Sequence, residues 1–115
     1  MIFSLFKSNQ KSFIGVDIVA NFYKSGKWKH KRSSILRRDE YLCQECSRYG
    51  KSTAATTVHH INPLEQHPEG ALQSWNLISL CSSCHDAMHD RTTRELTALG
   101  MVWVERVAPH PSIRK

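Results

Sequence analysis

The residues that could do chemistry together are four histidines and one asparagine in the second half of the sequence: His59, His60, Asn76, His85 and His89. His85 and His89 are separated by three residues, a spacing that places two imidazoles one turn apart on one face of a helix. His59 and His60 end a short apolar stretch, and because adjacent strand residues point to opposite faces, they should have different roles. One ring can bind a metal ion while the other takes a proton from water. The set therefore indicates metal-assisted hydrolysis.

Four cysteines predict a second metal site. They form two matched pairs, Cys43-x-x-Cys46 and Cys81-x-x-Cys84, with 34 residues between them. A pair with this spacing presents both sulfurs to one ion, and two pairs supply the four ligands of a tetrahedral zinc site. Two disulfides are the alternative, but they need an oxidising compartment, and the sequence shows no export signal. We expect a structural Zn²⁺ bound by four thiolates, in a cytoplasmic protein.

Positive charge is concentrated in one segment of the chain. The formal net charge is +6, and residues 27–51 hold 8 of the 16 Lys and Arg residues beside three acids, a net of +5. Such a run is often only a solvated face, but beside a phosphate-cutting site it favours a nucleic-acid partner. The side chains expected to contact the nucleic acid are Lys29, Arg32, Arg37 and Arg38. No apolar stretch approaches the roughly 20 residues of a membrane span.

The elements that must position these residues fit one small domain of the 115-residue chain. With 40% hydrophobic residues, its core should need a metal as a staple. We assign the domain to residues 27–108, between an arm at 1–26, whose function the sequence does not reveal, and a loose tail at 109–115. Within it the patterns predict a basic helix over 28–38, a loop over 47–57, short strands over 58–61 and 77–80, a helix from about His85 to Leu99 that Gly100 ends, and a strand over 101–107.

Several motifs in a fixed order resemble the HNH endonuclease family. They are Arg38-Asp39-x-Tyr41-x-Cys43-x-x-Cys46, Val58-His59-His60-Ile61-Asn62-Pro63, Asn76-Leu77-Ile78-Ser79-Leu80 and Cys81-Ser82-Ser83-Cys84-His85. The resemblance covers roughly residues 28–91, and an ordered set of landmarks is far more specific than a lone motif. It implies an α+β fold with a ββα-metal (His-Me finger) core: two short strands and a helix around one divalent cation, with a four-cysteine zinc staple and a preceding basic helix.

The resemblance also implies a role for each candidate residue. His60 matches the general base. Asn76 matches the middle asparagine, which holds the loop before the second strand and orients the base through backbone contacts. His85 matches the closing histidine, a metal ligand, and His89 matches a second helix ligand of the colicin-like members. His59 stands where many members have a metal-binding aspartate and the colicin nucleases have a histidine. The implied activity is a DNA endonuclease.

The chemistry of such a site follows from its groups. Neutral His60 could take a proton from water, while a cation held by His59, His85 and His89 would bind a nonbridging oxygen and the departing 3′ oxygen, leaving 5′-phosphate and 3′-hydroxyl ends. Imidazole ligands suit Mn²⁺, Ni²⁺, Zn²⁺ or Co²⁺ better than Mg²⁺, so we expect manganese or nickel to support more activity than magnesium. A metal ion and a basic surface disfavour imidazolium, so cleavage should rise with pH from about 6 to about 8.

The main alternative is a catalytically silent zinc-ribbon module that binds DNA and never nicks it, and a third is a purely structural zinc protein. Cys81-x-x-Cys84-His85 also matches the haem-attachment pattern of c-type cytochromes, which would leave Cys43 and Cys46 unexplained. The setting stays open among bacteriophage DNA processing or packaging, restriction and mobile elements. A double-strand cut needs two sites or two visits, so a homodimer is one option.

Overall fold

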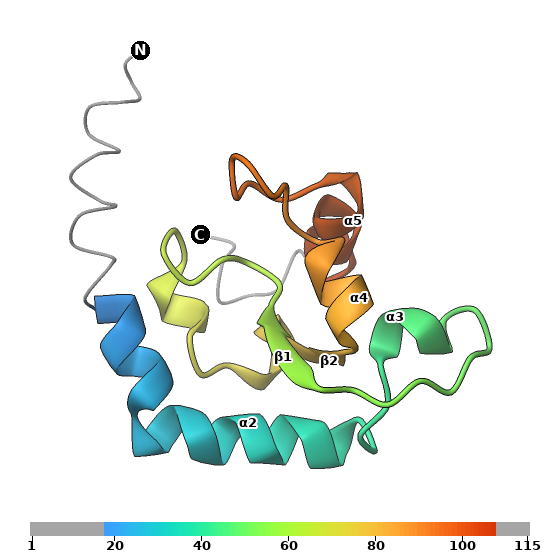
Figure 1. Cartoon of the computed structure of the whole chain (residues 1–115). Coiled ribbons are helices and arrows are strands. Elements are labelled where there is room, and N and C mark those ends of the chain that lie inside the picture. Colours follow the sequence, from blue (N-terminus) through green and yellow to red (C-terminus); the bar gives the residue numbers. More distant parts are fainter. Residues whose placement is uncertain (1–17, 108–115) are drawn as a thin grey trace.

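The computed structural model describes residues 18–107, in which a two-stranded sheet lies between helices (Figure 1). This confirms the expected small α+β fold. Most of the N-terminal arm and the tail at 109–115 lie outside the described residues. Residues 18–24 are helical and meet the next helix at Ser25. The elements that follow are α2 (Gly26–Arg38), α3 (Gln44–Ser47), β1 (Thr57–His60), the 3₁₀ turns η1 (Pro68–Gly70) and η2 (Ser74–Asn76), β2 (Leu77–Leu80), α4 (Ser82–Asp86) and α5 (Ala98–Val107).

The sheet separates two hydrophobic clusters. β1 and β2 are antiparallel, with His60 opposite Leu77 and Thr57 opposite Leu80. Because strand side chains alternate between faces, Val58 and Leu77 pack against α2, whereas Ile78 and Leu80 pack on the other side. The first cluster comprises Trp28, Ile35, Leu36, Val58 and Leu77, and the second Cys43, Ile61, Ile78, Leu80 and Met88. Both predicted strands are confirmed.

α2 begins and ends on specific side-chain contacts. The Ser25 hydroxyl accepts a hydrogen bond from the backbone N–H of Trp28, which caps the helix. Trp28 and Ile35, at helical spacing, are buried against the sheet. At the other end, the Asp39 carboxylate accepts a hydrogen bond from the backbone N–H of Ser79, fastening the helix to β2. The predicted basic helix is confirmed, and Trp28 is one of its core residues.

The chain after His85 differs from the expected long helix. α4 ends at Asp86, and the Asp90 carboxylate then accepts hydrogen bonds from the backbone N–H groups of Thr92 and Thr93. A short polar side chain that satisfies the backbone in this way competes with helix formation. Arg94 has a positive φ of 69°, which an α-helix does not allow. The helix predicted over 85–99 is therefore wrong beyond its first residues.

The predicted strand over 101–107 is also wrong, because α5 (Ala98–Val107) runs through it and through Gly100. Leu99, Trp103 and Val107 follow helical spacing and pack on the second cluster. A Cβ atom at Gly100 would lie 2.6 Å from the carbonyl oxygen of Met88. This glycine therefore permits close helix packing and does not end a helix. No helix within residues 18–107 is long and apolar enough to cross a membrane.

Candidate active site and metal centres

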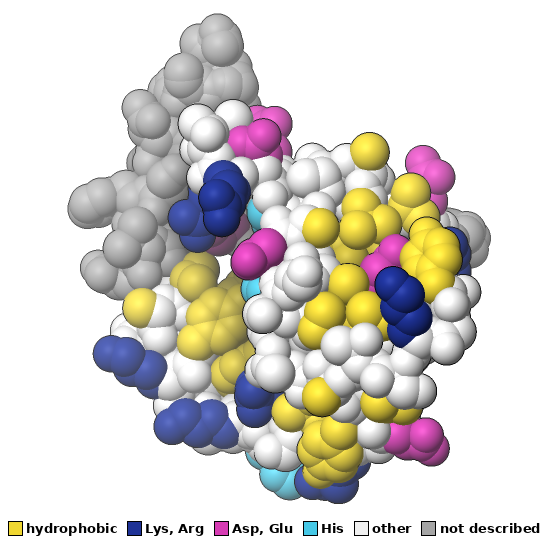
Figure 2. Space-filling view, turned by 45° about the vertical axis from the view of Figure 1, so that its right-hand side comes forward, with side chains coloured by type: hydrophobic (Ala, Val, Ile, Leu, Met, Phe, Trp, Pro, Cys, Tyr) yellow, Lys and Arg dark blue, Asp and Glu magenta, His cyan; other side chains and the backbone are white. Residues whose placement is uncertain are grey.

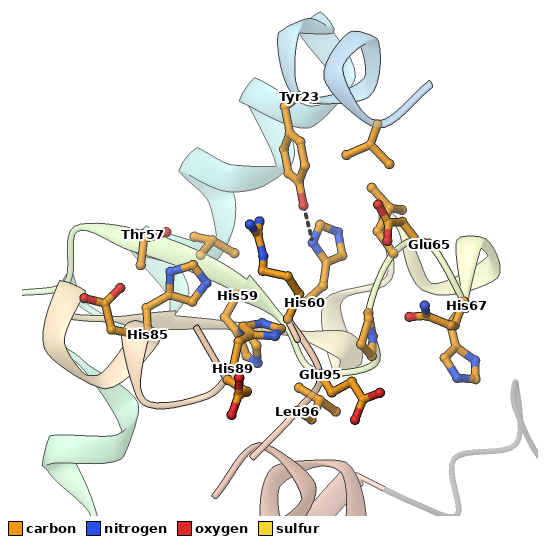
Figure 3. A pocket seen from close by; sticks show the side chains of 18 of the residues that line it. Tyr23, Thr57, His59, His60, Glu65, His67, His85, His89, Glu95 and Leu96 are labelled. Atoms are coloured by element: carbon orange, nitrogen blue, oxygen red, sulfur yellow. Dashed lines mark hydrogen bonds between the residues drawn. The ribbon is translucent and has the colours of Figure 1, made fainter. Parts of the chain in front are cut away.

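Three histidines from different segments meet on the face of the sheet that is turned away from α2. His59 comes from β1, His85 from α4 and His89 from the segment that follows, and one ring nitrogen of each lies within 4.8 Å of the others. Figure 3 shows His85 and His89 gathered near His59. The Nε2 atom of His59 is buried and has no hydrogen-bond partner in the described part of the chain. A buried polar atom without a partner is costly, so this nitrogen is suited to a metal ion.

The histidine cluster is poised as neutral ligands. Burial lowers the pKa of His59 to about 3, and the neighbouring His85 and His89 add to the effect. Burial also lowers the pKa of His85, with His89 contributing and Asp86 opposing. Neutral imidazoles keep the lone pair that a metal requires. Three nitrogen donors fit borderline divalent cations better than Mg²⁺.

The helical spacing of His85 and His89 suggested that one helix holds both residues, but the structure brings them together differently. His85 lies in α4, but His89 lies beyond it, in an isolated bridge with Leu96. The loop between His89 and α5 is closed by two backbone hydrogen bonds. The N–H of Asp90 donates to the carbonyl oxygen of Glu95, and the N–H of Arg94 donates to the carbonyl oxygen of Asp90. A built loop, rather than one turn of a helix, therefore positions His89.

His60 lies on the other face of β1, against α2. Its ring stacks on Trp28 with centroids 5.0 Å apart and an interplanar angle of 25°. The Nε2 atom lies 3.0 Å from the carbonyl oxygen of Ala71, and Nδ1 lies 3.2 Å from the hydroxyl oxygen of Tyr23 (Figure 3). A carbonyl oxygen can only accept, so Nε2 carries the proton of the neutral ring and Nδ1 has the lone pair. The sequence interpretation left a ring nitrogen free for water, whereas here Tyr23 occupies it.

The environment of His60 favours its neutral form. Burial lowers the pKa of its ring below the ordinary value of 6.5, and the hydrogen bond to Ala71 only partly opposes this. Without a proton on Nδ1, the ring can act as a base near neutral pH.

Asn76 is a fully buried hub that shapes the loop beside His60. Its side-chain oxygen accepts hydrogen bonds from the backbone and side-chain N–H groups of Asn62. Its Nδ2 donates to the carbonyl oxygens of Asn62 and Gly70. A Cβ atom at Gly70 would lie 2.7 Å from that Nδ2, so only glycine allows this approach. Because Gly70 precedes Ala71, Asn76 positions the carbonyl group that holds His60.

An open groove of about 1290 Å³ joins these groups. It is lined by His59, His60, His85 and His89 together with Tyr23, and also by three arginines, Arg32 from α2 and Arg91 and Arg94 from one loop. Arg91 and Arg94 lie in the loop after His89, which the sequence interpretation had placed in a helix. The signal that could have found them is the run 89–95, which contains no apolar residue and so does not continue an amphipathic helix.

The basic residues of α2 fall into two groups. Lys29 and Arg37 are exposed, and Arg32 donates to the carbonyl oxygen of Thr56 at the groove. Arg38 instead uses its guanidinium within the protein, donating to Asp39 and to the carbonyl oxygens of Ser74 and Leu77. In Figure 2, Lys and Arg side chains gather at the lower left of the molecule. Arg38 thus serves to join α2 to β2.

The four cysteines meet on the far side of the sheet from α2. Their sulfur atoms lie within 4.8 Å of one another, and all four are free thiols. In each pair the first sulfur accepts a hydrogen bond from the backbone N–H of the second, Cys43 from Cys46 and Cys81 from Cys84. This backbone contact lowers the pKa of the Cys81 thiol, whereas burial raises that of Cys43. The four cysteines form no disulfide here, and their arrangement matches a tetrahedral four-sulfur metal site.

One buried side chain that the sequence interpretation left without a role joins this cluster to the C-terminal helix. Glu45, between Cys43 and Cys46, is 6% exposed and accepts a hydrogen bond of 2.8 Å from the indole Nε1 of Trp103. Arg48 forms an ion pair with the same carboxylate. The first cysteine pair is therefore fastened to α5 as well as to the sheet.

Comparison with known proteins agrees with this geometry. The family model described as HNH endonuclease matches residues 43–91, the stretch from the first cysteine past the last histidine of the site. A solved structure, the HNH endonuclease of the deep-sea thermophilic bacteriophage GVE2 with manganese ion, is 39% identical with a TM-score of 0.63. The match covers 70% of this chain and 86% of that chain. Among curated proteins, none matches the chain.

Proposed function

The chain belongs to the HNH endonuclease family and is a metal-dependent nuclease that acts on phosphodiester bonds, and from this premise we propose that it cuts DNA with His60 as the base. The observation that carries the proposal is the convergence of His59, His85 and His89 at the groove that His60 also lines. The two histidines of β1 thus serve two roles from opposite faces of one strand.

The metal is assigned to the three-histidine cluster. Its buried, unpartnered His59 nitrogen and its three neutral donors fit a divalent cation. When bound, the cation would neutralise phosphate charge and stabilise the departing 3′ oxygen. Three protein ligands also leave coordination positions open to a substrate. We propose Mn²⁺, Ni²⁺, Co²⁺ or Zn²⁺ as better supporting ions than Mg²⁺.

His60 receives the proton of the attacking water at Nδ1. The Ala71 carbonyl fixes the tautomer by accepting from Nε2, which leaves Nδ1 as the basic atom. Asn76 keeps that carbonyl in place through Gly70, so it is a positioning residue. Attack by water at phosphorus with departure of the 3′ oxygen yields 5′-phosphate and 3′-hydroxyl ends.

The four thiolates are assigned to a structural Zn²⁺. They come from two short turns at the ends of α3 and α4, and they close the coordination sphere without an exposed position. α4 then connects this site to the reactive one, because Cys81, Cys84 and His85 lie within five residues.

DNA is expected to approach along α2 and the groove. The exposed Lys29 and Arg37 would neutralise phosphates there, together with Arg32, Arg91 and Arg94, which line the groove. The bacteriophage origin of the similar nuclease supports a role in phage DNA processing or packaging, in the cytoplasm of the host. One active site cuts one strand and so produces a nick. A double-strand cut would require a homodimer with two active sites, or two successive cuts by one enzyme molecule.

The test is plasmid nicking with Mn²⁺ by the wild type and the His60→Ala variant. Loss of a general base should lower the rate by about 10²- to 10⁴-fold, with DNA binding and metal content unchanged. His67→Ala is the matched control, since His67 pairs with Glu69 and lies away from the cluster in Figure 3. The rival is a silent DNA-binding module, which the occupied ring nitrogens of His60 favour. It would be supported if the wild type bound DNA with metal present and never nicked it.

A further inference from the structure

The helical residues 18–24 place the side chain of Tyr23 against His60, the proposed base. The chain turns sharply at Ser25, whose hydroxyl donates to the carbonyl oxygen of Phe22 at 2.7 Å and accepts from the backbone N–H of Trp28. This corner sets the 18–24 helix against the start of α2. As a result, the Tyr23 side chain points at His60 (Figure 3).

Four rings hold this corner together. Phe22, Tyr23, Trp28 and His60 contact one another in every pairing, with centroid distances of 5.0 to 5.9 Å. Edge-to-face and offset contacts of this kind stabilise a cluster beyond the area that it buries. The position of the Tyr23 hydroxyl is therefore set by packing.

The hydroxyl stands where the reaction needs water. Nδ1 is the ring atom of His60 with a lone pair, and a water that gives up its proton must lie within hydrogen-bond reach of it, about 2.6 to 3.2 Å. The Tyr23 oxygen is 3.2 Å from Nδ1. Burial, with a contribution from Glu65, raises the pKa of Tyr23, so the phenol keeps its proton and donates it to the ring. One lone pair cannot serve the phenol and a water at once.

We propose that Tyr23 caps the base: its hydroxyl holds Nδ1 of His60 in the resting enzyme and must leave before the ring can accept a proton from water. The proposal rests on the assignment of His60 as base. Tyr23 is 40% exposed and lines the groove, so the side chain has open space into which it can move. Residues 18–24 would then control access to the reaction, a role that the sequence did not reveal.

Tyr23→Phe tests the cap because it removes the hydroxyl and keeps the ring. If capped molecules cannot bind substrate productively, the apparent affinity is reduced by the fraction that is open. One neutral hydrogen bond is worth a factor of about 2 to 10 in that equilibrium. We expect kcat/KM for plasmid nicking to rise by that factor, through a lower KM, with kcat at the wild-type level. Tyr49→Phe, at a tyrosine that is 68% exposed, is the matched control and should change nothing.

A second measurement does not depend on activity. In ¹⁵N spectra of the imidazoles, Tyr23→Phe should move the Nδ1 signal of His60 towards that of an unbonded nitrogen, whereas Tyr49→Phe should leave it in place. An unchanged signal, or a kcat/KM equal to or below that of the wild type, overturns the cap. A lower kcat would instead make Tyr23 a positioning residue for His60. These failures are separate from that of the proposed function, which fails if His60→Ala still nicks at the wild-type rate.

Discussion

The cysteine cluster and the histidine cluster share the short helix α4 and differ in what surrounds them. The cysteine cluster is built from two turns that each fold back on their own first sulfur, and a buried glutamate and α5 pack around it. The histidine cluster is built from one strand residue, one helix residue and one loop residue, and it lines an open groove. A closed set of four ligands holds a fold, whereas an open set of three can accept a substrate.

Because both clusters use the short helix α4, the histidine cluster depends on the cysteine cluster, but the cysteine cluster does not depend on the histidine cluster. α4 has five residues, begins directly after Cys81 and contains both Cys84 and His85. If the thiolates lose their metal, the helix loses the anchor that aims His85. If the imidazoles lose theirs, the core clusters and the cysteine cluster remain. The comparison therefore predicts a global effect from one cluster and a local effect from the other.

The largest effect is expected from Cys43→Ser. Structural zinc contributes about 10 to 16 kcal/mol in small domains, which equals or exceeds the whole stability of a domain, about 5 to 15 kcal/mol. The variant should lose its cooperative thermal transition by circular dichroism and contain no metal in the cysteine cluster. A variant with the wild-type melting temperature and one metal ion fewer would show that the cysteine cluster does not hold the fold.

His85→Ala should give the opposite pattern. Mutation of a residue that only supports a metal ligand typically lowers metal affinity or activity by about 10- to 100-fold. Loss of the ligand itself should therefore lower the nicking rate by more than about 100-fold. Loss of the half-buried side chain should lower the free energy of unfolding by about 1 kcal/mol, which lowers the melting temperature by only a few degrees. Nicking, melting temperature and zinc content are measured on one preparation. Loss of the cysteine-bound zinc in this variant would mean that the clusters depend on each other in both directions.

The smallest effect is a shift in pH dependence. The base must be neutral, and burial lowers the pKa of His60 below 6.5, so the proton leaves the ring at a lower pH than in a free histidine. The nicking rate should rise with pH to a plateau, with its midpoint below about 6.5 rather than between 6 and 8. Metal content and circular dichroism at the same pH values separate this from acid release of the thiolate metal. A midpoint above 7 with the fold intact would contradict a buried base.

Sequence patterns predicted best where local structure and burial agree. β1 and β2 are short apolar runs, α2 has an apolar stripe among basic residues, and the cysteine spacing fits turns that fold back on themselves. The sequence therefore predicted the strands, the basic helix and the pairing of the cysteines.

The failures lie where tertiary contacts override local signals. Gly100 suggests a helix end but instead allows α5 to approach the backbone of Met88. A helix was expected to run on through residues 87–97, yet the Asp90 side chain satisfies the backbone there locally. Tyr23 has no motif around it, because its role comes from a corner at Ser25 that only the folded chain creates.

The placement of two adjacent histidines on β1 constrains how this chain can vary. Because side chains alternate along a strand, deleting or inserting one residue before His59 would present a different residue to each face. His59 would then point towards Trp28 and His60 towards His85, although both histidines would still be there. A change of length in the loop at 48–56 leaves the site intact as long as the loop absorbs it and His59 stays opposite Ile78. In a design setting, that pairing is the parameter to keep fixed while the loops around it are changed.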